Sequence, residues 1–240
     1  LRRLEKPNDL PTHLTRFELP FNHSTIKPEF IYADSMMTAE KAVEIIIKKL
    51  NSLEDITLLF THNLRTIKCI TYEREFSFIR SDDTSNGVVE INSESNHCLF
   101  RKWGRIIEWK GELHRPVEVA IRIDEEGSII PSEEYLVVTF PTLISTRMRL
   151  ILNGPYRTTP SRETIGEEDK FNMYLAEETS NLLCDIIRSE KKNGNLSLEL
   201  LEVLPIDHVR YGVPELVSLI FSRVRDFFID EEIIPAESGG

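Results

Sequence analysis

The chain has 240 residues, of which 40% are hydrophobic and 29% charged, and its formal net charge at pH 7 is -11. The acidic balance argues against nonspecific nucleic-acid binding as the main function, because a nucleic-acid backbone is held by many lysines and arginines together. No apolar run reaches the roughly 18 residues of a membrane-spanning helix, and the three cysteines are too few and too scattered for a disulfide framework. We therefore expect a soluble, cytoplasmic protein with no membrane partner.

The first half of the chain is predicted to be rich in strands. Residues 15–21 alternate like a strand, and Thr38 is expected to be the N-cap of a helix over residues 39–50. The single apolar face of this helix, which would lie on a sheet, consists of Ala39, Val43, Ile46, Ile47 and Leu50. Further strands are predicted at residues 56–60, 65–71, 75–80, 87–92, 117–123 and 135–140. Glycines at 104, 111 and 127 punctuate their connections. The succession of strands favours a largely antiparallel sheet.

An arginine-rich window follows. Residues 135–162 contain no aspartate or glutamate but four arginines, Arg147, Arg149, Arg157 and Arg162. A local surplus of guanidinium groups in an acidic chain indicates an anionic partner, because a guanidinium can donate two parallel hydrogen bonds to a phosphate or a carboxylate. The window is typical of a strand, a turn and a helix start, which would bring free backbone N–H groups to the same place. Strand alternation would place Arg147 and Arg149 on the face opposite Met148 and Leu150, toward solvent. The alternative is that these arginines pair with acids elsewhere on the surface.

The last third of the chain is predicted to be helical. Residues 167–194 begin with three acids and end with basic residues before Gly194, the order that a helix dipole favours. Its predicted buried stripe consists of Phe171, Leu175, Leu182, Leu183, Ile186 and Ile187. A short helix from Ser197 to Leu204 and a final helix opened by Pro214 complete an α+β architecture with a helical tail. The predicted buried stripe of the final helix consists of Leu216, Val217, Ile220, Phe221, Val224 and Phe228.

Common catalytic signatures are absent from the sequence. It contains no G-x-G-x-x-G, no G-x-x-x-x-G-K-[ST] and no G-x-S-x-G motif. His97 and Cys98 form the only metal-like pair, but adjacent residues on a strand point to opposite faces, so we predict no metal site. The acid pairs at 125–126 and 133–134 are expected to be solvated loop charges.

A family resemblance appears in the arginine window. The run NGPYRTTPSRE, residues 153–163, is followed by an aromatic-Asn pair, Phe171 and Asn172, at the predicted helix start. These features resemble the middle region of Hsp90-like (GHKL) ATPases, and most closely their sacsin-like branch. Residues 58–73 and 15–21 resemble two strands of the same branch, and the similarity covers about residues 14–205.

The resemblance implies a fold and a domain organisation. The expected fold is a mostly antiparallel body of the ribosomal S5-like, Hsp90-middle type with a C-terminal helical extension. Residues 1–24 would be a strand and linker from a nucleotide-binding domain, residues 25–165 the middle-type domain and residues 166–240 the extension. Because the chain opens on Leu1 and closes on Ser238, Gly239 and Gly240, we interpret it as a piece of a longer protein.

The resemblance also implies roles for individual residues. In Hsp90-type chaperones, the arginine of a Ser-Arg-Glu element reaches the γ-phosphate of ATP held by the preceding domain. Arg162 matches that position and would be the catalytic residue, with Arg157 as a second anion contact or a loop brace. Ser161 would contact phosphate or serve as a turn residue. The chaperones carry a glutamine four residues beyond the arginine, where this chain has Gly166.

Two functions remain open at this level. The family's nucleotide-binding motifs have no counterpart in residues 1–240, so we expect no cofactor and no ATPase activity in this chain alone, with ATP and Mg bound by the parent protein. The first hypothesis is a middle domain that couples the ATP state of a preceding nucleotide-binding domain to a chaperone client or partner protein. The alternative is an ATP-independent interaction module whose arginine patch binds an acidic protein or nucleic acid.

Overall fold

The computed structural model describes residues 39–70, 75–83, 87–94, 96–206, 213–231 and 233. The chain divides into two compact units, Leu1–Leu53 and Glu54–Gly240. In the first unit, helix α1 (Ala39–Asn51) forms where the sequence predicts a helix. Within it Ile47 is buried while Ile46, which was expected on the same covered face, is 38% exposed. The predicted strand at 15–21 and the cap at Thr38 lie outside the described residues.

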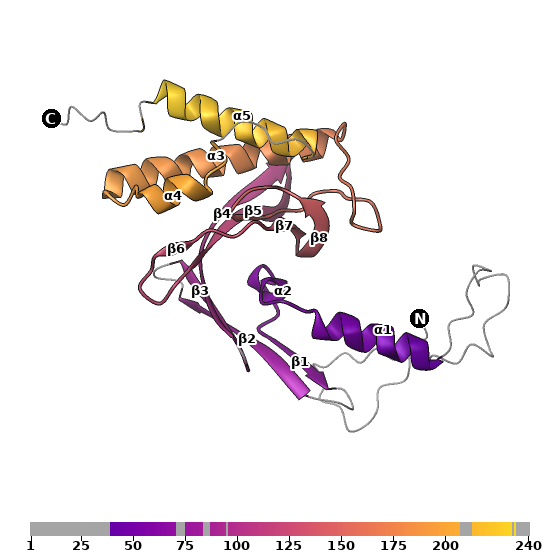
Figure 1. Ribbon diagram of the computed structural model, residues 1–240. Coiled ribbons are helices and arrows are strands. Elements are labelled where there is room, and N and C mark those ends of the chain that lie inside the picture. The colour runs from indigo at the N-terminus through magenta and orange to yellow at the C-terminus, as the bar shows by residue number, and fades with distance from the viewer. Residues whose placement is uncertain are drawn as a thin grey trace. The chain divides into compact units, whose positions relative to one another are not determined.

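The second unit holds a mixed, mostly antiparallel sheet of nine strands (Figure 1). Its strands are β1 (Thr66–Ile70), β2 (Glu75–Asp83), β3 (Val88–Ser93), β4 (His97–Trp109), β5 (Glu112–Ile123), β6 (Ile129–Ile130), β7 (Tyr135–Val138), β8 (Phe140–Ser145) and β9 (Ile151–Asn153). They lie in the order β1-β2-β3-β4-β5-β9-β7-β8, and β6 pairs with β5. The β7–β9 pair is parallel, whereas every other pair named here is antiparallel.

Three helices cover one face of the sheet, as Figure 1 shows: α3 (Lys170–Asn193), α4 (Leu198–Val203) and α5 (Glu215–Asp230). Helix α3 packs on β4 and β5, and α5 packs on α3. The alternating residues Val117, Val119, Ile121 and Ile123 of β5 enter this core together with the predicted stripe of α3, which is buried along its whole length. The α+β class and the C-terminal helices are therefore confirmed.

The other face of the sheet is covered by a short helix, α2 (Ile56–Leu59), which contacts β2, β3 and β8. The sequence predicted a strand at residues 56–60, and this prediction is wrong. A short apolar run has no period that separates a buried strand from a buried helix. Asp55 decides the outcome, because its side chain accepts a hydrogen bond from the Ile56 N–H at 2.9 Å and caps the helix.

Most predicted strands are present. The strands β4, β6 and β9 were not predicted, and Gly104, which was expected in a connection, lies inside β4, opposite Glu118 of β5. The strand predicted at 135–140 is two strands, β7 and β8, because Thr139 has a φ of 67° and reverses the chain. A β-branched residue rarely adopts this left-handed conformation, so its sequence carries no turn signal.

The long helix ends at Gly194 as predicted, but it begins at Lys170 rather than at residue 167, so the three acids expected in its first turn precede the helix. Asp169 caps the α3 N-terminus by accepting hydrogen bonds from the Phe171 and Asn172 N–H groups, and Gly194 ends the helix with a φ of 73°. In α5, the stripe predicted to end at Phe228 ends instead at Phe227, which is buried, while Phe228 is half-buried. Within the described part of the chain, no helix is long and apolar enough to cross a membrane.

Candidate functional site

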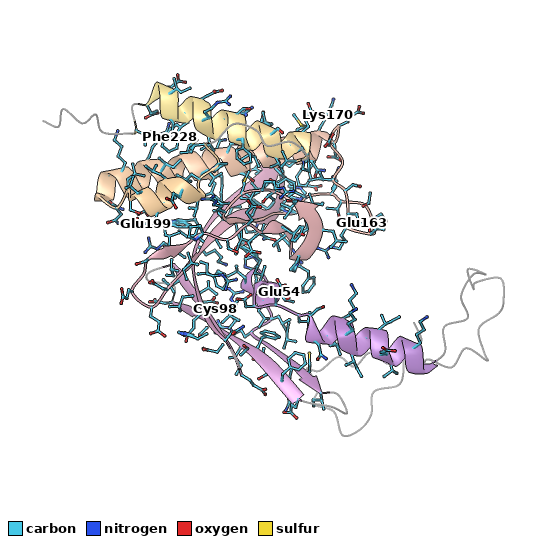
Figure 2. The ribbon with its side chains drawn as sticks, viewed as in Figure 1. Glu54, Cys98, Glu163, Lys170, Glu199 and Phe228 are labelled. Atoms are coloured by element: carbon cyan, nitrogen blue, oxygen red, sulfur yellow. The ribbon has the colours of Figure 1, made fainter. Side chains whose placement is uncertain are left out.

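All but the first residue of the run NGPYRTTPSRE lie in one loop, residues 154–169, which joins β9 to α3, and Phe171 and Asn172 lie in the first turn of α3. Figure 2 labels Glu163 in this loop and Lys170 at the start of the helix. Asn172, in the first turn of α3, is fully buried and holds the loop from inside. Its Nδ2 atom donates to the Arg157 and Gly166 carbonyls, both at 2.9 Å, and its Oδ1 atom accepts from the Arg157 N–H at 2.8 Å. Asn172 therefore fixes the two ends of the loop to each other.

The start of the loop is shaped by the ring of Tyr156. A Cβ atom on Gly154 would lie only 2.9 Å from this ring, so glycine is required for the close approach. The Tyr156 hydroxyl is 2.8 Å from Thr179 Oγ1 of α3. Burial raises the pKa of Tyr156 to about 12, so its hydroxyl stays neutral. This contact ties the loop to the middle of α3.

Arg157 lies against the helix start. Its guanidinium stacks over the Phe171 ring at 4.8 Å and donates to Asp169 Oδ2 at 3.1 Å. Burial raises the pKa of Asp169, but hydrogen bonds from Asn172, Arg157 and Phe171 outweigh burial and hold it below its ordinary value. Asp169 is therefore a carboxylate at neutral pH and neutralises the nearby charge of Arg157. This arrangement makes Arg157 a brace of the loop.

Arg162 sits at the end of a tight turn. The Arg162 N–H donates to the Thr159 carbonyl at 2.9 Å, and Arg162 has a φ of 63°. Its carbonyl accepts from the Leu143 N–H of β8 at 3.0 Å. Its Nη2 atom donates to the carbonyls of Val138 at 2.7 Å and Phe140 at 2.8 Å. Both the backbone and the side chain of Arg162 thus bind the β7–β8 hairpin.

The remaining donors of Arg162 are not used within the described residues. Its Nε atom is buried without a hydrogen-bond partner there, and its Nη1 atom donates to none of the described groups. No carboxylate of the described residues lies within ion-pairing distance of Arg162. The group is a cation held at one end by neutral carbonyls, and it keeps capacity to donate to an anion.

The other predicted site residues are exposed. Ser161 lies on the loop surface with its hydroxyl 3.2 Å from Thr159 Oγ1, as expected of a turn residue. Arg147 and Arg149 face solvent while Met148 and Leu150 are buried, which confirms the predicted alternation. This segment is not a strand, however. Arg147 lies 3.6 Å from Glu133, whereas Arg149 has no ion-pair partner within the described ranges.

Sequence reasoning missed a buried polar network on the α2 face of the sheet. Glu118 of β5 is 3% exposed and accepts hydrogen bonds from Lys102 Nζ at 3.0 Å and Asn153 Nδ2 at 2.7 Å. The sequence offered one signal: Ala120, two residues beyond Glu118 and on the same face of the strand, is a small apolar residue of the kind a covered face accepts. Ala120 is fully buried, so this face is covered as well.

No group of three or more potential metal ligands occurs in the described ranges. Comparisons with protein-family models, with curated proteins and with solved structures found no match to the chain.

Proposed function

We propose that the chain is the middle segment of an Hsp90-like ATPase of the sacsin-like branch, with a fold of the Hsp90-middle type. In this role it couples the ATP state of a preceding nucleotide-binding domain to a partner or client protein. The support is that the resembling residues form one braced unit rather than a set of separate surface positions. Asn172, Tyr156 and Arg157 hold the loop that carries Arg162.

The observation that carries the proposal is the state of the Arg162 guanidinium. Nη2 is fixed by two carbonyls and Nη1 keeps its donors, while no described acid neutralises the charge. A donor that is already oriented costs little reorganisation when charge develops on a transferring phosphoryl group. A guanidinium also matches the oxygens of a terminal phosphate in shape and charge.

The loop residues then have separate tasks. Arg162 donates to the terminal phosphate, Arg157 holds the loop against α3, and Ser161 offers an exposed hydroxyl beside them. Mg bound with ATP in the preceding domain would supply further neutralisation of phosphate charge. Arg162 therefore acts as a sensor of the nucleotide held by the other domain.

The alternative, an arginine patch that docks an acidic protein or nucleic acid, has less support. Arg147 pairs with Glu133 and Arg157 pairs with Asp169, so two of the four arginines are already neutralised by described acids. A cooperative cationic patch needs several free cations together.

The test is Arg162→Ala in the parent ATPase, with Arg149→Ala as the matched control from the same window. Losing one preorganised donor lowers turnover by about ten- to a thousandfold, with ATP binding nearly intact. Arg149→Ala should leave turnover unchanged. Steady-state ATPase rates, ATP titration and melting temperatures are measured on both variants. Unchanged turnover in a folded Arg162→Ala protein would overturn the proposal.

A further inference from the structure

The buried network around Glu118 extends to the bend that holds Arg162. Glu118 and Asn153 are direct neighbours across β5 and β9, and their side chains are joined by the 2.7 Å hydrogen bond. Asn153 in turn accepts a hydrogen bond at its Oδ1 atom from the Thr139 N–H at 2.9 Å. Thr139 is the residue with positive φ between β7 and β8. One side chain, Asn153, therefore links the buried carboxylate to the bend.

The bend is held from both sides. Asn153 accepts a hydrogen bond from the Thr139 N–H, and Arg162 Nη2 donates hydrogen bonds to the carbonyls of Val138 and Phe140. These two residues lie directly before and after Thr139. The Thr139 hydroxyl accepts from Arg115 Nη1 at 2.7 Å. The positions of the two carbonyls depend on the bend, and the bend depends on Asn153. The place of the Arg162 guanidinium thus depends on Asn153.

The charge state of the network is balanced within the fold. Lys102 Nζ lies 3.0 Å from one Glu118 oxygen, and His62 Nε2 lies 3.4 Å from the other. Gly104, opposite Glu118 on β4, leaves room for the carboxylate, since a Cβ there would come within 3.3 Å of Glu118 Cγ. A carboxylate this deeply buried persists only when it is paired and hydrogen-bonded. Asn153 Nδ2 is one of the donors that it needs.

We propose that Glu118 and Asn153 are positioning residues for Arg162, acting through the backbone bend at Thr139. The effect on the loop follows from the contacts of this chain alone, whereas the effect on phosphate chemistry rests on the proposed function. Neither residue touches the nucleotide. Their task is to keep the two acceptor carbonyls where Nη2 meets both of them.

An exchange of the two side-chain types tests this arrangement. Asn153→Asp places a carboxylate against Glu118 and loses the Nδ2 donor. Glu118→Gln removes the negative charge and replaces one of the two acceptor oxygens, of which one accepts from Lys102 and the other from Asn153, by an NH2 donor. In the double variant Glu118→Gln/Asn153→Asp, the new amide at position 118 can donate to the new carboxylate at position 153 and still accept from Lys102. That carboxylate can still accept from the Thr139 N–H. The double variant keeps the formal charge and restores the hydrogen bonds with donor and acceptor reversed.

Two measurements distinguish the effect on the loop from the effect on phosphate chemistry. In this chain, hydrogen exchange is followed at the Thr139 and Leu143 amides, which bond to Asn153 and to the Arg162 carbonyl. In the parent protein, kcat and KM for ATP are measured. Each single variant should speed exchange at these amides and lower kcat by about tenfold with little change in KM, and the double variant should recover most of both effects.

Leu182→Ala is the control, because it weakens the helical core without touching the network. It should lower the melting temperature but leave kcat unchanged. The hydrogen-exchange rates of the Thr139 and Leu143 amides, divided by those of the other sheet amides, should also stay unchanged. If Asn153→Asp does not fold, Glu118→Gln and the double variant still decide the question. Exchange that stays slow in Glu118→Gln, or a double variant worse than Glu118→Gln, would overturn the inference. If the single variants speed hydrogen exchange but do not change kcat, Glu118 and Asn153 do position Arg162, and the proposed role of Arg162 in phosphate chemistry fails.

Discussion

Two partly buried arginines, Arg122 of β5 and Arg162 of the loop between β9 and α3, are held in opposite ways. Arg122 donates from Nη1 to Asp55 at 2.7 Å and to Cys98 Sγ at 3.1 Å, lies 4.0 Å from Glu134, and stacks over the Phe100 ring. Arg162 has no such neighbours among the described residues and is held by two backbone carbonyls. The charge of Arg122 is fully compensated inside the fold, whereas that of Arg162 is not. Compensation of the charge, rather than burial, separates an arginine whose charge is used within the fold from one that can meet an external anion.

The ionic cluster around Arg122 also sets the protonation of its members. Burial raises the pKa of Asp55, but the hydrogen bond and charge of Arg122 outweigh burial and hold it below the ordinary value of 3.8. Burial raises the pKa of Cys98 to about 11, and the carboxylate of Asp55 adds to this effect. The thiol is therefore neutral and a poor nucleophile at physiological pH. This cluster joins α2 to the sheet and offers no reactive group.

The largest expected effect is on stability, and it should fall on Arg122. Arg122→Met leaves Asp55 and Glu134 partly buried without their cation, which should lower the free energy of unfolding by about 2 to 4 kcal/mol. Arg162→Met loses two hydrogen bonds to carbonyls and should cost about 1 to 2 kcal/mol. Urea unfolding of the two variants measures the difference. A larger loss for Arg162→Met would show that its carbonyl contacts are the main structural tie, contrary to the comparison.

A second prediction concerns pH. Because its folded pKa is lowered, Asp55 contributes stability that is complete above its ordinary value of 3.8 and is lost as the pH falls through the folded pKa. Burial raises the pKa of Glu134 above its ordinary value of 4.5. The effect of Glu134 on stability therefore has the opposite direction: the contribution of Glu134 is complete below pH 4.5 and is lost as the pH rises through the folded pKa.

Removing Arg122 should change this profile, and removing Arg162 should not. Without the guanidinium, the pKa of Asp55 rises and the pKa of Glu134 rises further, so acid costs Arg122→Met less stability than it costs the unmodified chain. Arg162→Met should follow the unmodified chain in parallel, because its partners do not titrate. Unfolding free energies between about pH 2.5 and 5.5 provide the measurement. Parallel curves for all three proteins would remove the electrostatic basis of the comparison.

The sequence predicted best what is local. Helix α3 was recognisable because its acidic start, its apolar stripe and its terminal Gly194 all lie within one stretch of sequence, although Asp169 was expected inside the first turn and is the cap. The exposure of Arg147 and Arg149 followed from alternation with Met148 and Leu150, although the segment is no strand.

What the sequence could not predict depends on contacts between distant segments. The partners of Arg162 are backbone carbonyls, which every residue carries, so no residue type marks Val138 or Phe140 as acceptors. The burial of Glu118 depends on α2 covering the second face of the sheet, and α2 itself resembled a strand. Asn153 stood within the resembling motif, but its link to Thr139 requires the parallel pairing of β7 with β9.

The smallest expected effect tests the strain at the bend. Thr139, which lies beside the Arg162 guanidinium, has a φ of 67°, and this angle is costly for a β-branched residue. In the cluster around Arg122, by contrast, no member has a positive φ; the members are Asp55, Cys98, Arg122 and Glu134. Thr139→Gly should relieve about 1 to 2 kcal/mol of strain and lose about 0.5 to 1 kcal/mol to the greater freedom of the unfolded chain, for a net gain of at most about 1.5 kcal/mol. Thr139→Asn, which tolerates this conformation, should also be neutral or stabilising. Unfolding experiments on both variants, with hydrogen exchange at Leu143, provide the readout. A clear loss of stability in both would mean that the Thr139 hydroxyl and its bond from Arg115 stabilise the bend more than its conformation strains it.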